Sequence, residues 1–171
     1  TNVEFGNPKI EVRIDKENKK LHIIDQGLGM TADEVEKYIN QVAFSGAEEF
    51  LEKYKDSAKD SGIIGHFGLG FYSAFMVSDK ITVTSLCIDS DDAYAWEREG
   101  ADGYTISKAK KNSVGTEIVL HIKEDTDEVD YSKYLDEYEL KSLVKKYSDY
   151  ISFPIKMECT HHECIDEKEH K

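Results

Sequence analysis

Three short glycine-rich segments of the sequence carry residue types that could do chemistry. The first is Asp25-Gln-Gly-Leu-Gly-Met30, which directly follows an alternating apolar stretch. A carboxylate at the end of a strand can accept a hydrogen bond from an exocyclic amine. Gly27 and Gly29 would let the backbone approach a flat ring, and Met30 could pack on that ring. Alone, the pattern is more typical of an ordinary glycine turn.

The second segment runs from Gly62 to Tyr72 and holds four glycines before an expected helix start. Free N–H groups at a helix N-terminus bind phosphate without basic side chains. The segment lacks the G-K-[ST] of a Walker loop, and it does not directly follow the first strand as a Rossmann fingerprint would. Glycines that allow close helix packing remain an equal alternative.

The third segment is Asn112-Ser-Val-Gly-Thr-Glu-Ile-Val-Leu120. The hydroxyl of Thr116, where the chain enters a strand, could complete a polar cluster around Asp25. A plain turn into a strand is the simpler interpretation of this segment by itself.

The composition restricts how any such site could work. The chain has 171 residues, 39% of them hydrophobic, with 22 basic and 35 acidic residues and a net charge of −13. One packed domain is expected, and its acidity disfavours nucleic acid as a partner. A bound nucleotide would therefore depend on local backbone donors. No apolar run is long enough for a membrane span, and three cysteines favour a reducing compartment over a disulfide framework.

The elements that must position these segments follow from the hydrophobic pattern. Thr31 and Glu34 have the spacing of a capping box, so a helix should begin there with Val35 and Ile39 on its apolar face. A later helix should bury Leu140, Val144 and Tyr147. Strands are expected at 9–15, 20–24, 81–88, 93–99, 104–108, 116–122 and from 152, with the four middle strands forming an antiparallel meander, and the second helix at 135–147.

Together, the order and wording of the three segments resemble the GHKL ATPases, which include gyrase B-type topoisomerases, histidine kinases, MutL and the 90-kilodalton heat-shock chaperones. Further stretches resemble the chaperone family nearly word for word, and the likeness runs from about Ile10 to Met157. These stretches are Ala43–Phe50, Gly65–Lys80, Tyr94–Glu97, Gly115–His121 and Tyr147–Pro154.

The resemblance implies an α/β (α+β) two-layer sandwich with a mixed, mainly antiparallel sheet and helices on one face. Residues 1–157 would be an N-terminal ATP-binding domain without its first strand and helices, and 158–171 a polar linker toward a middle domain.

The resemblance also implies roles for single residues. Asp25 would bind adenine, Thr116 would join a water network beside it, and residues 43–65 would form a mobile lid. Phe44 replaces a lysine common in the family, and His66 replaces a glutamine. The nucleotide-binding residues implied in this way are Asp25, Gly29, Met30, Ser45, Gly46, His66, Gly68, Leu69, Gly70, Phe71 and Thr116.

The implied function is that of an ATP-dependent chaperone that assists the folding of client proteins. ATP, with Mg²⁺, would close the lid and favour a homodimer, and hydrolysis to ADP would reset it.

The catalytic Glu and the magnesium-binding Asn are expected upstream of Thr1. The chain should therefore carry no catalytic or metal-binding residue and should not hydrolyse ATP alone. A non-enzymatic module of the same shape is the rival hypothesis. The cytoplasm is the expected compartment, with the mitochondrial matrix as an alternative.

Three other features favour structural interpretations. Trp96 is expected in the core or on a sheet face. The run from Glu124 to Asp130 should be a solvated loop. Cys159, His162 and Cys164 fit no standard zinc spacing and belong to an expected polar tail.

Overall fold

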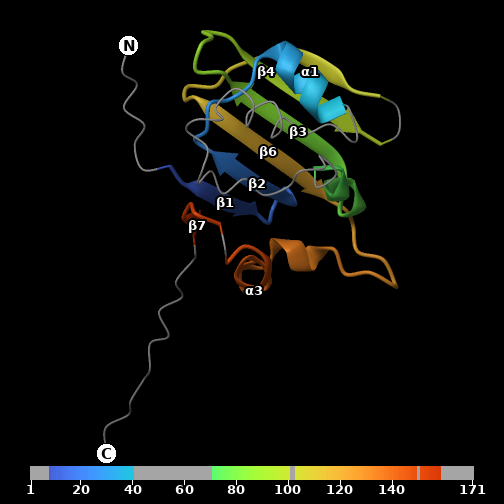
Figure 1. Ribbon diagram of the computed structural model, residues 1–171. Coiled ribbons are helices and arrows are strands. Elements are labelled where there is room, and N and C mark those ends of the chain that lie inside the picture. The colour runs from blue at the N-terminus through green and yellow to red at the C-terminus, as the bar shows by residue number, and fades with distance from the viewer. Residues whose placement is uncertain (1–7, 41–70, 101–102, 150, 159–171) are drawn as a thin grey trace, which may run out of the picture.

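The computed structural model describes residues 8–40, 71–100, 103–149 and 151–158. Within these ranges the chain forms a seven-stranded sheet with the order β5-β4-β3-β6-β2-β1-β7 (Figure 1). All neighbouring strands are antiparallel except β1 and β7, which are parallel. The strands are β1 Ile10–Asp15, β2 Lys20–Asp25, β3 Ser78–Leu86, β4 Ala93–Glu99, β5 Thr105–Ala109, β6 Gly115–Ile122 and β7 Ile155–Met157.

The described helices are α1 (Ala32–Asn40), α3 (Glu137–Tyr147) and two 3₁₀ helices, η1 (Phe71–Met76) and η2 (Ser132–Leu135). The predicted capping box at the start of α1 is confirmed. The Thr31 N–H donates to Glu34 Oε2 at 2.8 Å, and the Glu34 N–H donates to Thr31 Oγ1 at 3.3 Å. Helix α3 is capped at its N-terminus by Asp136, whose side chain accepts the N–H groups of Tyr138 and Glu139.

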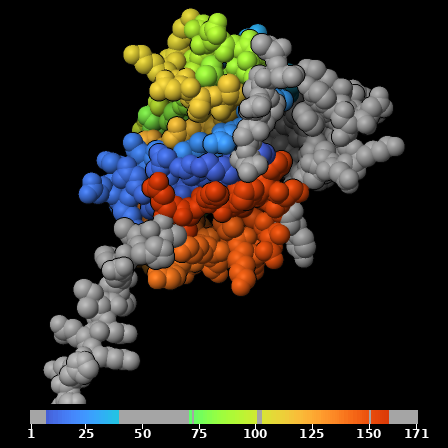
Figure 2. Space-filling model, turned by 90° about the vertical axis from the view of Figure 1, so that its left-hand side faces the viewer, coloured from blue at the N-terminus to red at the C-terminus, as the bar shows by residue number. Residues whose placement is uncertain are grey.

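One face of the sheet is apolar and covered. Val83 lies opposite Trp96 of β4 and Ile118 of β6, and residues paired in this way point to the same face. The buried core on this face also receives Val35 from α1 and Leu140 from α3. The prediction of helices on one face of the sheet is therefore confirmed. In Figure 2, β7 (red) lies beside β1 (blue), and α3 (orange) lies below them.

The other face of the sheet carries charged side chains. Lys80 Nζ lies 2.8 Å from Glu97 Oε1, and His22 Nδ1 lies 2.9 Å from Glu117 Oε1. His121 is paired with Lys20 on one side and with Lys80 on the other. Desolvation, and then the charges of these two lysines, lower the pKa of His121 below its usual value of 6.5.

The predicted meander is wrong in one respect. Strands β3, β4 and β5 are consecutive neighbours, as expected, but β6 does not continue beside β5. It returns to lie between β3 and β2, where it pairs with both. A central position suits β6, because Leu120 and Ile122 are both buried.

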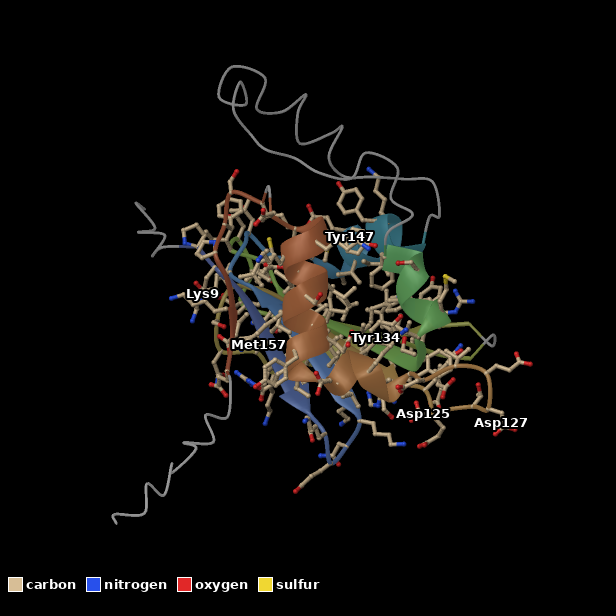
Figure 3. All side chains as sticks on the ribbon, turned by 90° about the horizontal axis from the view of Figure 1, so that it is seen from below. Lys9, Asp125, Asp127, Tyr134, Tyr147 and Met157 are labelled. Atoms are coloured by element: carbon tan, nitrogen blue, oxygen red, sulfur yellow. The ribbon has the colours of Figure 1, made fainter. Side chains whose placement is uncertain are left out.

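Smaller expectations also need correction. Tyr147 was expected on the apolar stripe of α3, but it is the last residue of that helix and is 70% exposed (Figure 3). The last strand begins at Ile155 rather than Ser152. The apolar stretch after Gly70 forms a 3₁₀ helix, η1.

Two structural interpretations are confirmed. Trp96 is only 1% exposed and lies in the core. The 124–130 loop is exposed throughout, and Asp127 lies at its outer side (Figure 3). The Asp125 carboxylate turns back to accept the N–H groups of Tyr131 and Ser132 at the start of η2. Cys159, His162 and Cys164 lie outside the described residues. None of the helices in the described ranges combines the length and apolar character needed to cross a membrane.

Candidate functional site

The candidate site is centred on Asp25, the last residue of β2. Its Oδ1 accepts the Gly27 N–H at 2.8 Å and the Thr116 N–H at 3.2 Å. Two backbone donors from different segments thereby fix the orientation of a half-buried carboxylate. In the described part of the chain, no donor bonds to Oδ2. This oxygen is an acceptor available to an external donor, and a carboxylate binds such a donor strongly.

The hydroxyl of Thr116 contacts a second hydroxyl, and its place in a water network beside Asp25 stays a prediction. The backbone N–H of Thr116 is the group that meets the Asp25 carboxylate. Thr116 Oγ1 instead lies 2.8 Å from Ser85 Oγ. Ser85 Oγ also accepts the Met30 N–H at 2.8 Å, so these hydroxyls connect β3, β6 and the loop before α1.

The sequence patterns predicted no role for Ser85. The alternation of β3 could have indicated this residue. Ser85 is in phase with Ile81 and Val83, so a polar side chain occupies a position of the buried face. A buried hydroxyl at such a position requires partners, and those partners are site residues.

Two glycines are needed for close approach of backbone segments. Gly29 has φ +69°, and a Cβ there would lie 1.9 Å from the Leu86 carbonyl oxygen. Gly115 has φ +118°, and a Cβ there would lie 2.3 Å from the Asp25 carbonyl oxygen. The prediction for Gly29 was that it lets the backbone approach a flat ligand ring. The structure adds a stronger requirement, because the loop packs directly on the end of β3.

Of the predicted nucleotide-binding residues, the structure brings together Asp25, Gly29, Met30 and Thr116. Met30 packs against the hydrophobic core from the site side. Phe71 begins η1, and its ring meets Trp96 edge-on at 5.7 Å between centroids, so its side chain belongs to the core. Its backbone role with phosphate stays a prediction. The others lie outside the described residues: Ser45, Gly46, His66, Gly68, Leu69 and Gly70.

A groove of about 450 Å³ lies between α3 and strands β1, β2 and β7. Ile23, two residues before Asp25 and on the same face of β2, is part of its lining. The groove therefore continues the covered face of the sheet away from the carboxylate. Its walls are mostly aliphatic, with Lys141 and Lys145 on the helix side.

Metal ligands are not gathered in this part of the protein. Within the described ranges, no group of three or more His, Cys, Asp and Glu side chains is arranged to hold a metal ion.

Residues 6–133 match the profile of the family described as histidine kinase-, DNA gyrase B-, and HSP90-like ATPase. The chain belongs to this family. The matched range includes both Asp25 and Thr116, so the two segments that meet at the carboxylate lie within the family's domain.

Curated relatives narrow the resemblance within the family. The chain is 53% identical over 160 residues to the chaperone protein HtpG of Clostridium acetobutylicum, an alignment that covers 92% of this chain and 25% of that protein. It is 50% identical over 161 residues to HtpG of Natranaerobius thermophilus, covering 94% and 26%, and 51% identical over 152 residues to HtpG of Bacillus subtilis, covering 88% and 24%. The chain thus spans about a quarter of the length of these relatives. The resemblance to the chaperone branch of the family is confirmed.

Proposed function

We propose that this chain is the nucleotide-binding part of an ATP-dependent molecular chaperone. The observation that carries the proposal is the Asp25 carboxylate, with Oδ1 fixed by two backbone donors and Oδ2 bonded to none of the described donors. The exocyclic amine of adenine is the donor that such an acceptor would bind. Family membership and the similarity to HtpG proteins support adenine over other amines.

The residues would divide the work of binding. Asp25 would accept the adenine amine, Met30 would pack on the base, and Thr116 would keep the carboxylate oriented through its N–H. The phosphates would be held by backbone N–H groups at 68–71, with Ser45, Gly46 and His66 completing the site. Backbone donors suit a chain with a net charge of −13, because they attract phosphate without a basic surface.

In the intact protein we propose hydrolysis of the bound ATP with Mg²⁺, which would neutralise charge on the phosphates. We further propose a homodimer that acts on unfolded client proteins in the cytoplasm.

The test is Asp25→Asn in the intact protein, with ATP binding measured by titration calorimetry. The amide lacks the charge and offers a donor where an acceptor is required. Binding should weaken by about 1.5–3 kcal/mol or be lost. Asp15→Asn is the matched control, because Asp15 also ends a strand and accepts bonds from Asn18 in its turn, away from the site. Unchanged ATP affinity in Asp25→Asn would refute the proposal.

A further inference from the structure

Ser85 is completely buried in the middle of the sheet, on the covered face. Ser85 occupies a position of the buried face of β3, in phase with Ile81 and Val83. An unsatisfied hydroxyl at such a position would cost free energy, so its partners determine what the residue does.

This hydroxyl has three polar partners within hydrogen-bonding distance. A serine hydroxyl has one donor and two acceptor positions. Ser85 Oγ donates to the Gly115 carbonyl at 3.3 Å and accepts the Met30 N–H at 2.8 Å. Thr116 Oγ1 lies 2.8 Å from Ser85 Oγ, in a hydrogen bond that either hydroxyl can donate. Replacement of Ser85 by an apolar residue would leave these partners without their bonds.

The partners of Ser85 belong to the two segments that meet at Asp25. Thr116, through its N–H, is itself a donor to Asp25 Oδ1. Gly115 lies against the Asp25 carbonyl so closely that no side chain fits there. Met30 ends the loop that begins with Asp25. The hydroxyl therefore connects the loop before α1 with the start of β6, and Asp25 lies between those two segments.

We propose that Ser85 is a positioning residue of the nucleotide site, fixing Met30 and Thr116 relative to the Asp25 carboxylate so that the adenine base meets both. The proposal rests on the proposed function. Ser85 acts through Met30 and Thr116 and needs no contact with the nucleotide.

Ser78 provides a matched control in the same strand. It is 1% exposed, and its hydroxyl donates to the Ala74 carbonyl at 2.6 Å. Its bond joins β3 to η1 and reaches none of the four described residues at the carboxylate site. Ser78→Ala and Ser85→Ala therefore remove equally buried hydroxyls from opposite ends of β3, and a purely structural role predicts the same effect on binding for both.

The experiment compares Ser85→Ala, Ser78→Ala and Asp25→Asn in the intact protein, with ADP and GDP as titrants in calorimetry at a temperature where circular dichroism shows each variant folded. Ser85→Ala should lose roughly tenfold or more in ADP affinity and reduce the preference for ADP over GDP. Ser78→Ala should keep both. Amide exchange at Met30 should accelerate only in Ser85→Ala. If that variant does not fold, Ser85→Cys, which retains the side-chain size with a weaker acceptor, should shift both readouts in the same direction.

The outcomes separate the two claims. Normal ADP affinity in Ser85→Ala with lost affinity in Asp25→Asn would overturn the role of Ser85 and leave the proposed function intact. Equal losses in Ser85→Ala and Ser78→Ala would show general destabilisation and overturn it as well. Normal affinity in Asp25→Asn would refute the proposed function itself.

Discussion

Gly29 lies directly against the carbonyl of Leu86, so that a β-carbon at position 29 would stand 1.9 Å from that oxygen. The neighbouring Leu28 carbonyl accepts the Ile88 N–H at 2.8 Å, so this contact is part of a backbone junction between the loop and the end of β3. Backbone atoms cannot move aside as the tip of a flexible side chain can.

Gly29→Ala should therefore destabilise the protein by more than its backbone conformation alone explains. Gly100→Ala is the control, because Gly100 has a similar φ of +61° but nothing within 4 Å of an added Cβ. Measured by urea unfolding, Gly100→Ala should lower the free energy of unfolding by about 1–2 kcal/mol. Gly29→Ala should lower it by clearly more. Equal costs would show that the loop moves away from Leu86 without penalty.

Trp96→Ala should be among the most destabilising single changes in the sheet. Trp96 is 1% exposed, meets Phe71 edge-on and stacks on Tyr104 at 6.2 Å between ring centroids. A loss of about 3–5 kcal/mol is expected from the cavity and the lost contacts. Tyr138→Ala, at a side chain 81% exposed on α3, should change stability by less than about 0.5 kcal/mol. Circular dichroism in urea can follow both variants; a cost below about 1 kcal/mol at Trp96 would contradict the described packing.

His121 should make the protein less stable as the pH falls below about 6.5, its ordinary pKa. Burial, then Lys20 and Lys80, lower its pKa in the folded state, while Glu97 and Glu99 oppose this. The unfolded chain therefore takes up a proton first, and protonation favours unfolding. His121→Gln should lose less stability than wild type between pH 7 and pH 5.5 by urea unfolding.

The two proteins should show equal pH slopes between pH 7.5 and 8.5, where the imidazole is neutral in both states. Identical slopes in the acidic range as well would show that His121 titrates alike in the folded and unfolded chains.

Thr31→Ala should weaken the start of α1. The Thr31 hydroxyl accepts the Glu34 N–H, and the Glu34 carboxylate accepts the Thr31 N–H. Loss of this cap should cost about 1 kcal/mol, whereas Thr31→Ser should be nearly neutral. Thermal unfolding measured for both variants is the check; a loss as large in Thr31→Ser would mean that the methyl group, not the hydroxyl, is responsible.

Local patterns predicted most elements of this fold. Alternation identified the strands, and the Thr31–Glu34 spacing identified the start of α1. The position of β6 could not be predicted in this way, because a strand's neighbours depend on pairing between residues far apart in the sequence. Tyr147 fits a helical stripe by spacing, but where the core ends is decided by the sheet beneath the helix.

The residues of the candidate site also divide into those that local patterns predict and those that depend on the fold. Asp25 and the glycines at 27 and 29 stand out in the sequence because they are grouped. Ser85 does not, because one serine in an alternating strand looks ordinary until its register is aligned with Ile81 and Val83. Its partners Met30 and Thr116 come from other segments, so only the folded chain reveals the cluster.

The insertion of β6 between two earlier strands also sets an order of events during synthesis. Asp25 and its donor Thr116 are 91 residues apart in the chain. Forming this contact closes a long loop, and the entropic cost of that closure slows folding. A nascent chain can pair β1 with β2 and β3 with β4 early. The two halves of the sheet stay unjoined until β6 leaves the ribosomal exit tunnel, and until then the carboxylate lacks its second backbone donor. The central edges of β2 and β3 are unpaired during this interval, which makes it the period of greatest exposure to aggregation.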